Sequence, residues 1–162
     1  MMKHLIKINL IFLLLVTFCG KKAEKIGKVE DFTLTSIDGE SYTLSQLKGR
    51  VVLVDFWATW CSPCRSAIPV LITLYNKFNE SGFVVLGISN EEMTTLKNFR
   101  DEMQIPYPIL LGNNDVMQAY DVQAIPTVVI FNKKGEMTKR QVGFAPDLEA
   151  TLEFHIDSLL KE

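Results

Sequence analysis

The chain has 162 residues, of which 48% are hydrophobic and 22% charged, and this suits one globular domain with a core of ordinary size. Its formal net charge of −2 indicates neither a nucleic acid nor an acidic molecule as partner. The sequence contains no internal repeat or low-complexity tract, so its function has to be sought in individual motifs.

The first 19 residues differ from the rest of the chain. Lys3 and Lys7 precede an apolar stretch over 10–18, which is shorter than the roughly 20 residues needed to span a bilayer. A basic beginning and a short apolar stretch are typical of an export signal rather than of a buried core helix. We therefore expect residues 1–19 to be a signal sequence, a lipoprotein signal or an uncleaved anchor. The folded part would then lie in the cell envelope, facing the periplasm.

Cys19 bears on how the protein is held at the membrane. The stretch over 16–19 resembles a lipoprotein processing box, in which the cysteine is lipidated and becomes the new N-terminus. Phe18 departs from the small residue that usually precedes that cysteine, so an uncleaved anchor stays open. Without Lys3 and Lys7, 15 basic and 19 acidic side chains remain, which is a net charge of about −4.

The elements that follow alternate between strand and helix. Residues 20–30 are polar and lysine-rich, as in a linker, and we expect one domain over 31–162. Periodicity in its first half predicts a hairpin, a buried valine-rich strand, a helix and a strand, over 31–49, 50–58, 62–80 and 83–89. The second half predicts a helix capped by Asn90, a short strand, a short helix, two paired strands and a last helix, over 91–103, 107–111, 115–120, 126–131, 136–143 and 146–160. This order indicates an α/β sandwich around a mixed sheet.

Cys61 and Cys64 form a C-x-x-C pair, which admits several uses. A structural zinc site needs four cysteine or histidine ligands, and the chain has only two histidines, His4 and His155, both distant in sequence. Copper delivery would favour a histidine or methionine beside the thiols. A purely structural disulfide would close too small a loop to stabilise the fold much. All three remain alternatives to redox chemistry.

Redox chemistry has positive support. Cys61 follows a strand and begins a helix, where free N–H groups and the helix dipole favour a thiolate. Cys64 lies one turn further along, where it can attack a mixed disulfide formed at Cys61. Pro63 suits the first turn of a helix, and neither Ser62 nor Pro63 is a cation that would overstabilise the thiolate. The pair is therefore expected to be reducing rather than strongly oxidising.

Asp55 stands inside the apolar run that precedes the cysteines. A carboxylate buried there would be desolvated, which raises its pKa and lets it exchange protons with Cys64. An exposed position on an edge strand is the alternative.

The stretches VDFWATWCSPC and IPTVVIFNKKGE, with Pro69 between them, resemble the thioredoxin superfamily from about residue 31 to the C-terminus. The export signal, the lead-in hairpin and the extra segment around 90–108 are similar to its membrane-anchored TlpA/ResA branch. The resemblance implies a three-layer α/β/α sandwich with a central mixed sheet, an N-terminal hairpin extension and a helix-strand insertion. It also implies a thiol-disulfide oxidoreductase in which Cys61 attacks and Cys64 resolves.

The resemblance further implies which residues meet the substrate. The Ile125-Pro126 bond would be cis, beside the cysteines, and its preceding backbone would pair with substrate; a trans proline that opens a strand is the alternative. Trp57 and Trp60 would flank the site. The expected substrate-binding residues are Trp60, Ser62, Pro63, Ile125 and Pro126. We expect no metal, and no cofactor beyond the Cys61–Cys64 disulfide.

Two positions depart from the relatives that the resemblance suggests. Several ResA-like proteins carry a glutamate three residues after the second cysteine, where this chain has Ala67. Asp55 instead resembles the buried acid of thioredoxin itself, so proton handling should follow the thioredoxin pattern. Peroxiredoxins share the lead-in hairpin, but their threonine before the reactive cysteine is Ala58 here, which disfavours a peroxidase.

These observations predict a membrane-anchored reductase of disulfides in exported proteins, with apocytochrome c as one substrate that the resemblance suggests. A membrane electron donor would regenerate its dithiol, and we expect a monomer. A disulfide oxidase or isomerase is the alternative within enzymes. A binding module that uses the groove at Ile125 and Pro126 without turnover is the alternative outside them.

Overall fold

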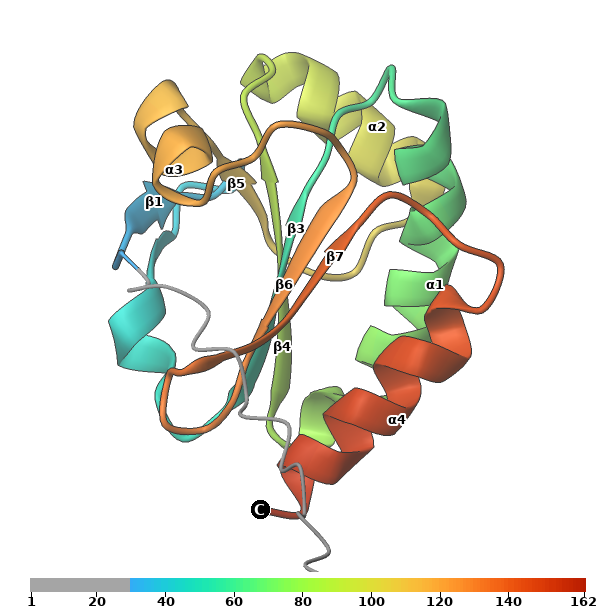
Figure 1. Cartoon of the computed structure of the whole chain (residues 1–162). Helices are drawn as coiled ribbons and strands as arrows, with labels where there is room; N and C mark the ends of the chain where they lie inside the picture. Colours follow the sequence, from blue (N-terminus) through green and yellow to red (C-terminus); the bar gives the residue numbers. More distant parts are fainter. Residues whose placement is uncertain (1–29) are drawn as a thin grey trace, which may run out of the picture.

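The structure is a computed structural model, and it describes residues 30–162 (Figure 1). The strands are β1 (Thr33–Thr35), β2 (Ser41–Thr43), β3 (Val51–Phe56), β4 (Phe83–Ser89), β5 (Ile109–Leu111), β6 (Thr127–Phe131) and β7 (Met137–Val142). The α-helices are α1 (Ser62–Phe78), α2 (Met93–Met103), α3 (Asn114–Ala119) and α4 (Leu148–Leu160), and two short 3-10 helices are η1 (Leu44–Leu47) and η2 (Asn79–Ser81). The expected signal or anchor over 1–19, with Cys19, and nearly all of the expected linker lie outside the described residues.

The main sheet has five strands in the order β5-β4-β3-β6-β7. β3 pairs in parallel with β4, which pairs in parallel with β5, whereas β6 is antiparallel to both β3 and β7. All six residues of β3 are buried, because the strand has neighbours on both edges and is covered on both faces. The mixed sheet predicted from the sequence is therefore confirmed. An edge position for Asp55 is wrong, since β3 is the central strand.

The two faces of the sheet are covered differently (Figure 1). On one face α1, α2 and α4 pack against alternate residues of β3, such as Val51 and Leu53, and this cluster is the α1-side core. On the other face the β1–β2 hairpin, η1 and α3 pack against Val52, Val54 and Phe56, forming the hairpin-side core. The three-layer sandwich is confirmed, and the second outer layer consists of the hairpin, η1 and α3. Among residues 30–162, no helix is both long and apolar enough to cross a membrane.

The hairpin extends the fold at the edge of the sheet. β1 and β2 pair antiparallel, and Gly39 in the connecting turn has a φ of 91°, a backbone conformation that glycine adopts without strain. The N–H of Ile37 donates to the carbonyl of Ile109 at 2.9 Å, and Ser36 forms a bridge with Leu110. These contacts with β5 fix the predicted N-terminal extension against the domain.

Most predicted elements are present, and α2 shows the clearest difference in its bounds. The sequence predicted a helix from residue 91 capped by Asn90, whereas α2 begins at Met93 and its N-cap is Glu92. Glu92 has extended backbone angles, and the side chain of Glu91 accepts hydrogen bonds from the neighbouring loop. Those tertiary contacts hold residues 91 and 92 outside the helix.

Candidate active site

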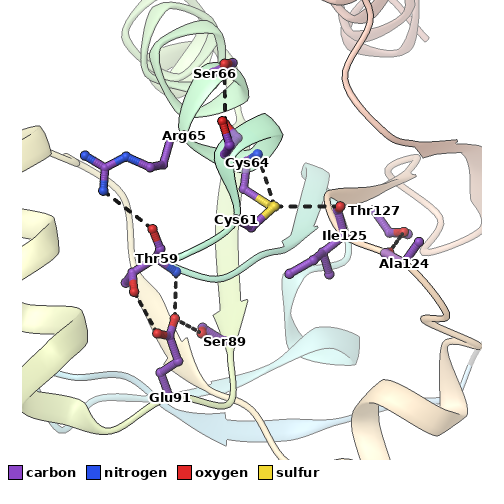
Figure 2. The surroundings of a disulfide bond; sticks show 11 residues. Thr59, Cys61, Cys64, Arg65, Ser66, Ser89, Glu91, Ala124, Ile125 and Thr127 are labelled. Atoms are coloured by element: carbon purple, nitrogen blue, oxygen red, sulfur yellow. Dashed lines mark hydrogen bonds between the residues drawn. A yellow bond between two sulfur atoms is a disulfide. The ribbon is translucent and has the colours of Figure 1, made fainter.

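The cysteine pair lies at the start of α1, after the short loop that follows β3 (Figure 2). Cys61 is the N-cap of the helix, and its Sγ accepts the backbone N–H of Cys64 at 3.3 Å. The two sulfurs are joined in a disulfide. Cys61 is 5% exposed and Cys64 1% exposed, so Cys61 is the more exposed residue of the pair. The N-terminus of α1 therefore provides the helix dipole and an N–H donor at Cys61.

The Ile125-Pro126 bond faces the pair from the loop before β6. The bond is cis, as expected, and the carbonyl oxygen of Ile125 lies 3.7 Å from Cys61 Sγ (Figure 2). The carbonyl of Pro126 accepts the N–H of Gly143 at 2.8 Å, which joins this loop to the end of β7. Residues more than sixty positions apart in the chain thus meet at one sulfur.

The other predicted contact residues lie at the surface beside Cys61. Trp60 is 75% exposed, and Ser62 and Pro63 are also exposed. Trp57, which was also expected to flank the site, is buried in the same core cluster as both cysteines and packs against Phe99 with ring centroids 5.2 Å apart. An exposed large aromatic side chain next to a reactive sulfur offers an apolar surface to an approaching polypeptide.

Asp55 is buried on β3. It alternates with Val51 and Leu53, so it faces the α1-side core that also contains Cys64. Its Oδ1 has no hydrogen-bond partner, and burial raises the pKa of its carboxyl from 3.8 to about 7. The buried Tyr107 belongs to the same core, and its pKa is raised by burial and further by the charge of Asp55. Asp55 can therefore take up and release a proton near neutral pH.

One residue that contacts the active-site loop was not predicted. Glu91 accepts hydrogen bonds from the backbone N–H and the hydroxyl of Thr59, both at 2.7 Å (Figure 2). The sequence placed Glu91 in the first turn of a helix. Because the carboxyl ends of neighbouring parallel strands lie at one edge of a sheet, its place just after β4 could have indicated that it lies near the loop after β3.

No cluster of three or more cysteine, histidine, aspartate or glutamate side chains that could hold a metal ion occurs within residues 30–162.

Comparison with known proteins places this geometry in a family. The sequence matches the AhpC/TSA family over residues 27–140, which include both cysteines and the cis proline. The chain belongs to the AhpC/TSA family. Thiol-disulfide oxidoreductase ResA of Geobacillus kaustophilus is 30% identical to it over 145 residues, which cover 88% of this chain and 82% of that protein.

Two solved structures have the same fold, and both are named as thioredoxins or thioredoxin-family proteins. A thiol:disulfide interchange protein of the thioredoxin family from Chlorobium tepidum has a TM-score of 0.73 and 28% identity, covering 80% of this chain and 93% of that one. The pneumococcal exposed lipoprotein thioredoxin Etrx1 of Streptococcus pneumoniae has a TM-score of 0.69 and 26% identity, covering 80% of this chain and all of that one. With the Cys61–Cys64 disulfide, these likenesses make this AhpC/TSA protein a thiol-disulfide redox enzyme, as its sequence predicted.

Proposed function

We propose that the protein is a reductase of disulfides in exported proteins. The observation that carries the proposal is the joining of Cys61 and Cys64 at the N-terminus of α1, with Cys61 beside the exposed Trp60 and the Ile125 carbonyl. An attacking sulfur needs access and a nearby donor, and Cys61 is the more exposed residue of the pair and accepts the backbone N–H of Cys64.

The proposed reaction transfers two electrons in two exchanges. In the reduced protein, the Cys61 thiolate attacks a substrate disulfide, breaks its S–S bond and releases one substrate thiolate. Cys64 then loses its proton to Asp55 and attacks Cys61 Sγ, which forms the Cys61–Cys64 disulfide and releases the second substrate thiolate. The reaction needs no cofactor beyond this disulfide. An external dithiol, supplied in the cell by a membrane electron donor, returns the pair to the reduced state.

The contacts at the cis proline suggest how substrate is held. The Ile125 carbonyl faces Cys61 Sγ, so an extended substrate segment that pairs with this backbone would place its disulfide at the reactive sulfur. The resemblance to ResA-type proteins points to apocytochrome c among the exported substrates. Such a substrate is a polypeptide with a flexible disulfide, which can approach the exposed rim formed by Trp60, Ser62 and Pro63.

Reduction of a model substrate tests this function. The purified protein, with its pair reduced, is expected to reduce the disulfides of insulin, and its reduction potential should lie nearer about −270 mV than about −120 mV. The reason is that the residues between the cysteines, Ser62 and Pro63, carry no cation that would stabilise the reduced form strongly. Protein with intact Cys61 that leaves insulin oxidised would contradict the proposal. A potential near about −120 mV would indicate an oxidase instead.

We also propose that the protein is anchored outside the cytoplasmic membrane through lipid on Cys19. The processing box over 16–19 supports this, as does the likeness to a solved exposed lipoprotein of Streptococcus pneumoniae. Cells fed a palmitate analogue are expected to label the wild-type protein, whereas a Cys19→Ala variant should carry no label. Membrane association of the variant without label would indicate an uncleaved anchor. Absence of label on the wild type would contradict lipidation.

A further inference from the structure

A single carboxylate ties the loop after β3 to the end of β4. Glu91 Oε2 accepts the backbone N–H of Thr59, and Oε1 accepts its hydroxyl, each at 2.7 Å (Figure 2). The hydroxyl of the fully buried Ser89 donates to the same Oε2 at 3.2 Å. Three donors therefore converge on one side chain. An ionised glutamate, which only accepts, matches this set, and hydrogen bonds to a charged acceptor are the stronger kind.

Thr59 is also held from α1, through Arg65, which in turn contacts α2. Arg65, one residue after Cys64, points Nη1 at the carbonyl of Thr59 at 3.5 Å and Nη2 at Glu102 at 3.2 Å. Its guanidinium lies 4.9 Å from the ring centroid of Phe99 on α2. The backbone N–H, the hydroxyl and the carbonyl of Thr59 are thus all engaged by Glu91 or Arg65. The segment that follows β4 takes part in every one of these contacts, directly or through Arg65.

The position of Thr59 governs that of Cys61. The N–H of Cys61 donates to the carbonyl of Ala58 at 3.2 Å, which closes a turn with Thr59 and Trp60 in its middle. This turn sets the direction from which Cys61 enters α1. Its sulfur then has to meet the N–H of Cys64 and the carbonyl of Ile125 together. Small displacements of a reactive atom are costly for a reaction, so an anchor on this turn acts on reactivity.

We propose that Glu91 is a positioning residue of the redox centre, which holds Thr59 and thereby fixes Cys61 Sγ against the first turn of α1. This inference rests on the proposed disulfide reduction and deepens it. Glu91 does not touch substrate or the sulfurs; it acts through the turn over 58–61. The segment between β4 and β5, which the sequence analysis described only as an insertion, thereby affects the reactivity of Cys61 through Glu91.

Paired variants test the proposal. Glu91→Gln keeps the size of the side chain but loses one acceptor oxygen and the charge, whereas Thr59→Val removes one donor and leaves the charge at Glu91. Each is expected to raise the pKa of the Cys61 thiol by about one unit and to lower kcat/KM for insulin reduction about tenfold at neutral pH. The thiol pKa is read from the ultraviolet absorbance of the thiolate. The double variant should have the same thiol pKa and kcat/KM as Glu91→Gln alone, because both substitutions disrupt the same contact between Glu91 and Thr59.

Two controls separate positioning from charge and from folding. Glu92→Gln removes a neighbouring charge from an exposed side chain that makes no capping bond, and should leave the thiol pKa and kcat/KM unchanged. Thr59→Ser keeps the hydroxyl and should retain wild-type values. A lowered thiol pKa in Glu91→Gln would show that Glu91 acts only as a charge, and would overturn the proposal. An unchanged thiol pKa in Thr59→Val would also overturn the proposal, even if the variant had a lower melting temperature than the wild type.

The proposed function can fail without this inference failing. If wild-type protein does not reduce insulin, the reductase function is contradicted, but the thiol pKa values of the same variants still decide whether Glu91 positions Cys61. If wild-type protein reduces insulin and the Glu91 and Thr59 variants match it in thiol pKa and kcat/KM, only the positioning role is wrong.

Discussion

The Cys64→Ser variant is expected to accumulate a covalent complex with its substrate and to lose multiple-turnover reduction of insulin. Cys61 keeps its place at the N-cap of α1, with the Ile125 carbonyl 3.7 Å from its sulfur, so it can still attack. Without Cys64 Sγ, no internal thiol can break the mixed disulfide. The complex should be seen on a non-reducing gel, disappear on addition of dithiothreitol, and reveal the exported substrate when isolated from cells.

Cys61→Ser is the matched control for this trap. It leaves Cys64, which is almost fully buried below the first turn of α1, and we expect neither a mixed disulfide nor insulin reduction. The variant Cys61→Ser, Cys64→Ser tests the binding module. If partners bind this double variant as tightly as they bind the wild type, the groove at Ile125 and Pro126 binds them without any thiol exchange. A trap that forms equally through Cys64 in the Cys61→Ser variant would contradict the assignment of Cys61 as the attacking sulfur.

The sequence predicted the central part of the fold because burial on two faces leaves a strong pattern. The valine-rich run became β3, and Phe83–Ser89 has the bounds that were expected. The helix after Cys61 was also predictable, since a proline in the first turn and apolar residues at helical spacing act locally. These features need no knowledge of which segments meet in space.

The parts that were missed depend on tertiary contacts. Trp57 and Trp60 look equivalent in the sequence, yet the N–H of Trp57 still bonds the carbonyl of Ile88, and its ring enters the core over Gly87. Glu91 looked like a helix residue because its contact with Thr59 joins the ends of two strands. The hairpin and the short α3 cover one face of the sheet, but their few residues do not reveal which face they bury.

Asp55→Asn is expected to change how stability depends on pH. In the folded protein the carboxyl of Asp55 has a pKa of about 7, raised by burial from 3.8. Between these values the native state keeps a proton that the unfolded chain has lost, so stability falls as the pH rises through this window. The difference between the two pKa values corresponds to a loss of roughly 4 kcal/mol in the free energy of unfolding above pH 7.

Asparagine cannot ionise, so the stability of the Asp55→Asn variant relative to wild type should rise by a few kcal/mol from about pH 4 to about pH 8. Urea unfolding of both oxidised proteins across this range measures the change. Glu80→Gln, at an exposed position, is the control and should follow the wild-type curve. Parallel curves for Asp55→Asn and wild type would show that the carboxyl is not held protonated by burial.

The same substitution should slow the second exchange. Resolution of the mixed disulfide requires Cys64 to lose a proton, and in wild type its rate should rise through pH 7 as Asp55 becomes able to accept one. Asp55→Asn is expected to be about 10²-fold slower at pH 7, without that inflection, in single-turnover measurements. Equal rates would exclude Asp55 from proton transfer. A buried carboxyl group whose Oδ1 has no hydrogen-bond partner opposes folding when it ionises, so we expect its place in the central strand to reflect proton exchange with Cys64.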